Sequence, residues 1–257
     1  MNENRIGEQS YNTQGCLMQI IEYNSSRDVL VEFQDKYHYR KRTIYGNFKS
    51  GRVENRYYPT IQGVGMLGIR KTWNDINHKK NREYITWAEM LRRCYSHNEN
   101  ERLKFSAYND CSVDQEWHLF DNYYDWVQTQ TNHMIDDWTL DKDIKIKHNR
   151  IYSCDTCYLV PIQINMLFER QPSIRGNLPI GVQYKPKNSL RPYMAMCRQG
   201  AENIYLGSFA NEYDAFYAYK QFKEKHIKNV AEKEFELGNI TEECYKSLMT
   251  YSVDYDD

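Results

Sequence analysis

The most constraining feature of this sequence is a pattern in residues 178–236. Three short runs rich in aromatic and aliphatic residues, at 181–185, 193–199 and 203–208, are separated by turn-forming residues. Beyond them the apolar residues recur every three or four positions, which is the helical spacing. Asn211 precedes this stretch and suits a helix N-cap, because its side chain can accept from free N–H groups of the first turn. The pattern predicts three strands followed by one long helix.

Alternation along these strands predicts which side chains face away from the helix, because successive residues of a strand point to opposite faces. If Ala195 and Cys197 face the helix, their strand neighbours face outward. The expected outward set comprises Gln183, Lys185, Met194, Met196, Arg198, Asn203 and Tyr205, and we add Lys187 and Arg191 as candidate DNA contacts. Cationic, amide and phenolic groups bind phosphates and base edges, whereas methionines are typical of protein-binding surfaces. Both partners stay open, and DNA is favoured.

The residues of this segment also follow a family pattern. The matching residues, in order, are Gly181-Val182, Tyr193-Met194-Ala195-Met196-Cys197, Tyr205-Leu206-Gly207-Ser208-Phe209, Ala215 and Ala218-Tyr219. The segment resembles Apetala-type (ethylene-response-factor-like) DNA-binding domains, which place a three-stranded sheet in the DNA major groove with the helix behind it. The resemblance implies duplex DNA as a partner. Met194 and Met196 replace polar residues of that family, and the outward face has fewer arginines.

Residues 83–170 are predicted to form a second, α/β unit. The expected elements, in order, are helices at 85–95 and 113–129, a short strand from Trp138, a second strand at 157–160 and a brief helix at 162–169. A polar loop that contains Asn149 joins the two strands, and residues 172–177 are expected to form a linker.

This second unit carries a further resemblance. The matching residues, in order, are Trp87, Met90, Arg93-Cys94-Tyr95, Cys111-Ser112-Val113, Glu116-Trp117, Phe120, Trp126, Leu140-Asp141-Lys142-Asp143-Ile144, Asn149, Tyr152-Ser153, Cys157, Val160-Pro161 and Asn165. They resemble the HNH-type proteins that phages and mobile elements encode, often beside an Apetala-type module. The resemblance implies phosphodiester hydrolysis, in which a histidine activates water and Asn, His or Asp side chains hold a divalent cation.

The position where the resemblance implies that histidine is occupied by Lys142. A lysine cannot act as a general base near neutral pH unless burial or neighbouring charges lower its pKa by several units. The flanking Asp141 and Asp143 favour the charged form of the lysine. We therefore predict that the catalytic base is absent or is supplied by another residue.

A substitute site is available in the following loop. Its candidate residues are Asp141, Lys142, Asp143, His148, Asn149 and Asn165, of which Asp141, Asp143 and His148, with Asn149, can hold one Mg²⁺. Asn165 matches a helix position for a metal or phosphate contact. The alternative is a solvated hairpin, in which the aspartates pair with neighbouring lysines and His148 is an exposed turn residue.

The cysteines bear on metal binding and on the compartment. Cys154 and Cys157, with Cys94 and Cys111, offer four thiolates for zinc, but only the first pair has knuckle spacing, so zinc is not expected. Seven cysteines do not indicate a disulfide framework. The sequence shows neither a membrane-spanning apolar run nor a secretory leader pattern, so a cytoplasmic protein without membrane contact is expected.

Residues 1–70 are predicted to form a small, barrel-like β unit. Runs at 17–23, 29–33 and 42–48 are rich in Ile, Val, Tyr and Phe and alternate with turn-forming residues. Residues 37–42 mix aromatic rings with positive charges, which fits either contact with a phosphate backbone or an ordinary charged edge strand. The fold class is therefore α+β, with this unit, the central module, the C-terminal sheet and helix, and an acidic tail at 237–257 that forms a short helix and a frayed end.

The charge balance limits the function. The chain has 34 basic and 35 acidic residues, so it is neither a polycation nor a strong DNA mimic, and nucleic-acid binding has to rest on a local basic face. The leading hypothesis is a phage or mobile-element DNA-binding protein derived from a homing-type HNH endonuclease, with catalysis weak or lost. The alternatives are a protein that binds a host (defence) protein, and an active magnesium-dependent endonuclease. Homo-oligomers are compatible with all three.

Overall fold

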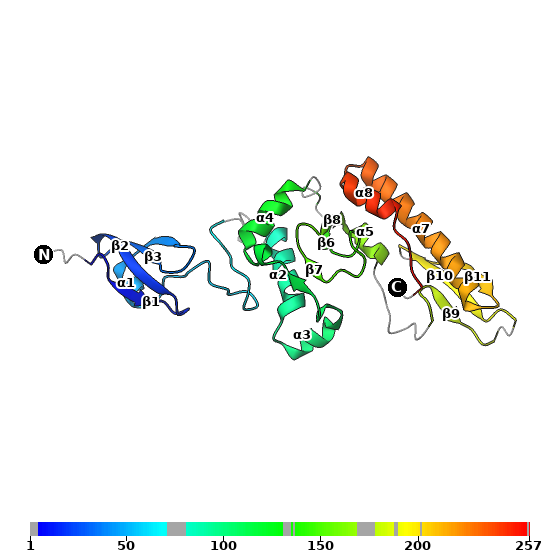
Figure 1. Cartoon of the computed structure of the whole chain (residues 1–257), viewed down its shortest axis with the longest axis horizontal. Coiled ribbons are helices and arrows are strands. Elements are labelled where there is room, and N and C mark those ends of the chain that lie inside the picture. The colour runs from blue at the N-terminus through cyan, green and yellow to red at the C-terminus, as the bar shows by residue number, and fades with distance from the viewer. Residues whose placement is uncertain are drawn as a thin grey trace. The chain divides into compact units, whose positions relative to one another are not determined.

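The computed structural model describes residues 5–70, 81–130, 135, 137–168, 178–187, 190–200, 202–255 and 257. The fold is α+β, as predicted (Figure 1). It divides into two compact units, Met1–Val127 with Arg150–Ser153, and Gln128–Asn149 with Cys154–Asp257. The predicted linker at 172–177 lies outside the described residues. No helix in the described ranges is long and apolar enough to cross a membrane.

The first unit begins with a four-stranded antiparallel sheet. Its strands are β1 (Gln9–Tyr11), β2 (Leu17–Ser25), β3 (Asp28–Phe33) and β4 (Arg40–Thr43), in the spatial order β1-β2-β3-β4. The predicted barrel is wrong, because β1 and β4 are the two edges of this sheet and do not pair with each other. Both edge strands are short, so each can reach only its hairpin partner.

The strand predicted at 42–48 is also wrong in its second half. The chain leaves β4 after Thr43 and forms the short helix α1 (Tyr45–Lys49). This helical turn places Phe48 in the core beneath the sheet, where it is fully buried together with Met18 and Val31. A strand would have alternated these residues between faces, whereas the core needs Phe48 on the side that the helical turn provides.

The rest of the first unit consists of α2 (Arg82–Tyr95), α3 (Glu99–Lys104), a short 3₁₀ turn η1 (Ser106–Tyr108), β5 (Ser112–Val113), η2 (Gln115–His118), α4 (Phe120–Thr129) and β7 (Ile151–Tyr152). The helix predicted near 85–95 is confirmed as α2. The single helix predicted at 113–129 is broken, because Val113 belongs to β5, which pairs in parallel with β7, and because Leu119 forms a bridge with Met66. The 3₁₀ turn that follows lets the carbonyl of Trp117 accept from the Trp87 indole at 2.7 Å.

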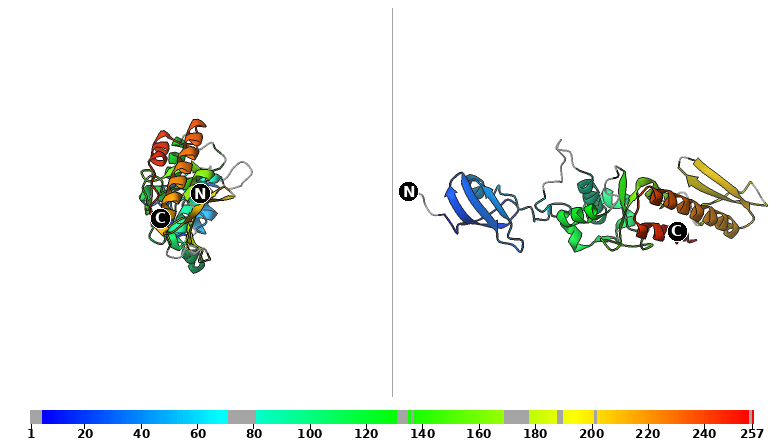
Figure 2. Two further views of the ribbon diagram at one scale, coloured as in Figure 1. Left: turned by 90° about the vertical axis from the view of Figure 1, so that its right-hand side faces the viewer. Right: turned by 90° about the horizontal axis from the view of Figure 1, so that it is seen from above.

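The second unit contains β6 (Trp138–Asp141), β8 (Tyr158–Pro161), α5 (Ile162–Asn165), η3 (Met166–Phe168), β9 (Val182–Tyr184), β10 (Tyr193–Gln199), β11 (Glu202–Phe209), α7 (Glu212–Glu236) and α8 (Glu242–Met249). β6 and β8 form an antiparallel pair, and β11-β10-β9 form the predicted three-stranded sheet. Asn211 caps α7 as predicted, since its side chain accepts from the N–H of Asp214. The helix α7 lies along one face of the three-stranded sheet (Figure 2).

One hydrophobic core joins segments of the second unit that the sequence pattern separates. Ile144 and Val160 from the β6–β8 region pack with Ile227 of α7, Leu248 of α8 and Val253 beyond it. The short helix predicted in the tail is confirmed as α8. The frayed end is wrong, because Val253 is buried and its carbonyl accepts from Lys220 at 2.6 Å.

Candidate nucleic-acid interface and the loop after β6

The three-stranded sheet has the two faces that strand alternation predicts. Val182 of β9 and Ala195 of β10 are buried against Ala215 of α7. On the opposite face, side chains of neighbouring strands meet in cross-strand rows: Gln183, Met194 and Ser208 in one row, Met196 and Tyr205 in the next, and Arg198 with Asn203 in the third. Polar and cationic groups therefore surround the two methionines.

A β-bulge in β11 keeps the outward-facing side chains of β10 and β11 opposite one another. Ala195 pairs with Gly207 whereas the next residue, Met196, pairs with Tyr205, so Leu206 is the extra residue. Gly207 has a φ of 133°, which a residue with a side chain rarely adopts. The bulge allows Leu206 to pack on the core while Tyr205 stays 58% exposed.

Gly181 and Tyr219, two residues of the Apetala-type pattern, are in direct contact. Gly181 has a φ of 79°, and a Cβ added to it would lie 2.0 Å from Cδ2 of the Tyr219 ring. Only a glycine leaves room for this ring beneath the start of β9. The co-occurrence of these two residues in the sequence therefore has a packing explanation that does not depend on DNA.

The segment from β9 to β11 is locally basic. Residues 182–209 contain four basic residues and one acidic residue, a net charge of +3, in a chain whose total is −1. All the predicted DNA contacts are exposed, namely Gln183, Lys185, Lys187, Arg191, Arg198, Asn203 and Tyr205. Within the described residues, Lys185 and Lys187 form no ion pair, and Arg198 contacts only the carbonyl of Gly200, at 3.1 Å from Nε. These cations are available to an external anion.

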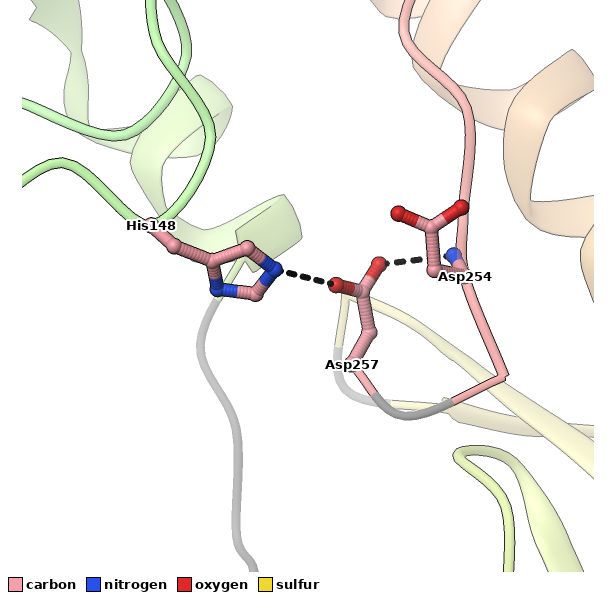
Figure 3. Close-up of side chains that lie close together, drawn as sticks. All are labelled: His148, Asp254 and Asp257. Carbon is pink, nitrogen blue, oxygen red and sulfur yellow. Dashed lines mark hydrogen bonds and ion pairs between the residues drawn. The ribbon is translucent and has the colours of Figure 1, made fainter.

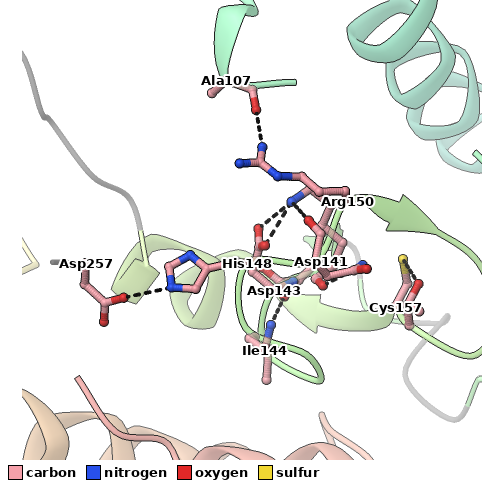
Figure 4. A network of polar contacts seen from close by, with 11 residues as sticks. Ala107, Asp141, Asp143, Ile144, His148, Arg150, Cys157 and Asp257 are labelled. Atoms are coloured by element: carbon pink, nitrogen blue, oxygen red, sulfur yellow. Dashed lines mark hydrogen bonds and ion pairs between the residues drawn. The ribbon is translucent and has the colours of Figure 1, made fainter. Parts of the chain in front are cut away.

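The loop after β6 is organised by Asp141, which lies at the end of that strand. Its Oδ1 accepts from the backbone N–H groups of Asp143 at 2.9 Å and Ile144 at 2.7 Å (Figure 4). The carboxyl group is buried, and this burial raises its pKa from 3.8 to about 6, although the two backbone hydrogen bonds act in the opposite direction. Asp141 therefore shapes the turn that follows β6.

Lys142 fills the centre of this loop. Its Nζ lies 2.9 and 3.0 Å from the two carboxylate oxygens of Asp143 and 2.7 Å from the carbonyl oxygen of Asn149. The Asn149 amide donates in return to the carbonyl of Lys142 at 3.1 Å. The ammonium group thus pairs with Asp143 and links it to the carbonyl of Asn149. The alternative of a solvated hairpin predicted an ion pair between an aspartate and a neighbouring lysine. That pair is present, but Lys142 is buried and not solvated.

The three predicted magnesium ligands do not converge. Asp141 uses Oδ1 on backbone donors and Asp143 faces Lys142, as described above. His148 adopts a left-handed conformation with a φ of 58°, and its Nε2 lies 3.7 Å from Oδ1 of Asp257 (Figure 3). Among the described residues, the one group of His, Cys, Asp or Glu ligand atoms close enough to share a metal ion is His148, Asp254 and Asp257.

The sequence prediction missed the partners of His148. Lys147 contacts both Asp254 and Asp257, the latter at 2.7 Å, and it also donates to the carbonyl of Ser252 at 2.8 Å. The acidity of the tail was visible in the sequence, but the contacts join residues that lie more than 100 positions apart. No local pattern could have paired them.

The remaining candidates lie apart from this loop. Asn165 ends α5 and is half-buried. Of the two cysteines with knuckle spacing, Cys154 is exposed and Cys157 is buried. Cys94 and Cys111 belong to the other compact unit.

Comparison with known proteins identifies no family for the chain. No protein-family model, curated protein or solved structure gives a significant match.

Proposed function

We propose that this chain is a DNA-binding protein and that the outward face of the β9–β11 sheet is its DNA contact. The observation that supports this most is the group of exposed cations on and beside that face, at Lys185, Lys187 and Arg198, which lack carboxylate partners among the described residues. Lysine and arginine that are not already neutralised can exchange their counterions for DNA phosphates.

The arrangement of the sheet fits duplex DNA. The DNA major groove admits strands as well as helices, and several DNA-binding proteins read it with a sheet. Arg198 and Asn203 are cross-strand neighbours, and these residue types form bidentate contacts with guanine and adenine. Lys185 and Lys187, in the segment that leads out of β9, suit contacts with the phosphate backbone.

The same proposal assigns the loop after β6 to a structural role. The resemblance to HNH-type proteins implies descent from a homing endonuclease of a phage or mobile element, in which a histidine and a metal ion carry out hydrolysis. Here Lys142 holds Asp143 and Asn149 together. A protonated lysine cannot accept a proton from water, so we propose that catalysis is weak or lost.

The test is a titration of the full chain with labelled duplex DNA at several salt concentrations, followed by fluorescence anisotropy. Salt-dependent binding that Arg198→Ala weakens supports the proposal. The control is Arg150→Ala, another exposed arginine, which belongs to the other compact unit and donates to the carbonyl of Ala107. Equal loss in both variants, or no binding by the wild type, contradicts the proposal.

A second candidate function follows from Met194 and Met196, which are half-buried on the outward face. Flexible thioethers of this kind adapt to protein partners. A host protein that binds the chain without DNA, and loses affinity on Met194→Ser/Met196→Ser, would favour this function. Metal-dependent nicking of plasmid DNA that is lost on Asp143→Ala would instead favour the active endonuclease.

A further inference from the structure

The segment 250–257 folds back onto the loop after β6 and onto α7. Lys220 of α7 donates to Ser252 Oγ at 2.7 Å, and the N–H of Val253 donates to Glu224 at 2.9 Å. The ring of Tyr255 stacks on Tyr213, with the centroids 5.3 Å apart. These contacts fix the direction of the segment, so its acidic side chains arrive at a defined place.

That place is a pair of basic residues at the tip of the loop. Lys147 forms ion pairs with Asp254 and Asp257. His148 lies beside the same two carboxylates (Figure 3). The Asp257 side chain is only 3% exposed, whereas that of Asp254 is 59% exposed. A buried carboxylate requires a cation beside it, and Lys147 supplies that cation.

We propose that Lys147 and His148 form a phosphate-binding site, which the carboxylates of Asp254 and Asp257 occupy in place of a phosphate group. A lysine ammonium binds carboxylate and phosphate oxygens in the same way, as a compact positive charge with several donors. His148 adds a ring nitrogen that is open to solvent, since 58% of its side chain is exposed. The ligand class is inorganic phosphate or the phosphodiester of a nucleic acid.

The sequence of residues 250–257 supports the idea that its carboxylates take the place of a phosphate group. Residues 250–257 contain three aspartates and no lysine or arginine. Asp254 and Asp257 come together in a turn, in which the N–H of Asp257 donates to the carbonyl of Asp254 at 3.2 Å, so that two carboxylates reach Lys147 as the oxygens of one phosphate group would. The segment therefore competes with nucleic acid for the loop, and charge neutralisation of the aspartates exposes the site. The nucleic-acid part of this proposal rests on the proposed function, whereas binding of inorganic phosphate does not.

The first experiment uses inorganic phosphate alone. Thermal unfolding of the wild type and of Asp254→Asn/Asp257→Asn is compared in phosphate and in chloride at equal ionic strength. We expect phosphate to raise the Tm of the variant by about 3 °C and to leave the wild type unchanged. Addition of Lys147→Gln to the variant should remove the increase. A Tm increase that is equal in the wild type and the variant, or that persists without Lys147, overturns the proposal.

A matched control separates the site from the overall charge. Glu236→Gln/Glu242→Gln changes the net charge by the same amount, and neither residue contacts Lys147 or His148 in the described structure. This control should show no increase in phosphate. If the double aspartate variant does not fold, Asp254→Asn alone is compared with the wild type, because that side chain is mostly exposed. A smaller increase in Tm is then expected, because Asp257 still contacts Lys147.

The second experiment uses duplex DNA. Asp254→Asn/Asp257→Asn should bind at least about threefold more tightly than the wild type, with a steeper dependence on salt, because one more phosphate is contacted. The ratio of the two DNA affinities, with and without the aspartate substitutions, should stay the same when both proteins also carry Arg198→Ala, which weakens binding to the sheet. Absence of DNA binding in every variant contradicts the proposed function but leaves the phosphate result to decide the site. A phosphate effect without a DNA effect limits the site to small phosphates.

Discussion

Two antiparallel sheets in this protein present basic residues on an exposed surface, and they differ in what those residues contact. In the N-terminal sheet, Arg40 lies 2.6 Å from Glu32, and Arg42 contacts Glu22 and Asp28 at 2.6 and 2.7 Å. On and beside the β9–β11 sheet, Lys185, Lys187 and Arg198 form no ion pair with a carboxylate within the described residues. Both surfaces present basic residues, but only the N-terminal sheet also carries the carboxylates that pair with them.

The difference shows why a count of basic residues is a poor guide to phosphate binding. An arginine that is paired with a carboxylate must exchange that partner for the phosphate, so the gain in free energy is small. The aromatic and basic run at 37–42 fits an ordinary charged edge strand, because β4 is an edge of its sheet and its arginines pair with β2 and β3 residues. Contact between that run and DNA stays a hypothesis.

The largest expected effect is on DNA affinity. The triple variant Lys185→Ala/Lys187→Ala/Arg198→Ala should bind duplex DNA about 100-fold more weakly than the wild type, because three phosphate or base contacts are lost. The slope of log K against log salt should become less steep by up to about 2.7. Anisotropy titrations at several salt concentrations measure both quantities. A loss of affinity without a change in slope would contradict phosphate contact at these positions.

The packing beneath the β9–β11 sheet gives the next effect. Gly181→Ala should lower the free energy of unfolding by about 3 kcal/mol, because the new methyl group collides with the Tyr219 ring and the backbone has a positive φ. Gly200→Ala is the matched control, since its φ is 60° and no atom lies near the added methyl. Gly200→Ala should lower the free energy of unfolding by only about 1 kcal/mol. Urea denaturation measures both, and equal losses would contradict the Tyr219 contact.

The carboxylates of the N-terminal sheet and the buried Asp141 at the end of β6 should respond to pH with opposite sign. Ion pairs hold the pKa of Asp28 and Glu32 below the ordinary range, so their stabilisation is present above the unfolded pKa and is lost as pH falls. Burial raises the pKa of Asp141 to about 6, so the folded state binds this proton more tightly than the unfolded state. The resulting stabilisation is present below pH 3.8 and is lost as pH rises through 6.

Asp141→Asn tests this sign. Asparagine keeps an oxygen that can accept from Asp143 and Ile144 but does not titrate. Relative to the wild type, the free energy of unfolding of the variant should increase by about 2–3 kcal/mol between pH 4 and pH 7. Urea denaturation at several pH values measures the difference. A difference that stays constant across this range would show that the folded state does not raise the pKa of Asp141.

The smallest effect is expected at the paired arginines of the N-terminal sheet. Arg40→Ala/Arg42→Ala should change DNA affinity by less than about twofold, because both side chains are already neutralised by carboxylates. The same titrations as for the triple variant provide the measurement. A loss comparable to that of the triple variant would show that the two sheets do not differ in function, and would make 37–42 part of the DNA contact.

The sequence by itself determined the elements that depend on neighbouring residues. The β10 strand has the predicted bounds, Tyr193–Gln199, and Asn211 caps the predicted helix, because strand alternation and helix capping act over a few residues. The outward exposure of Arg198 and Asn203 followed from the same alternation. Local physics was therefore sufficient for the sheet on which the proposed function rests.

Only the tertiary structure decided what depends on distant contacts. The predicted helix at 113–129 breaks because β5 pairs with β7, which lies far along the chain, and because Leu119 bridges Met66. The N-terminal sheet stays open because its two edge strands do not meet. Lys147 finds Asp254 and Asp257 across more than 100 residues, and no periodicity encodes that meeting. Such contacts form because burial of Val253 and its neighbours brings the segment to the loop, and burial is a property of the whole core.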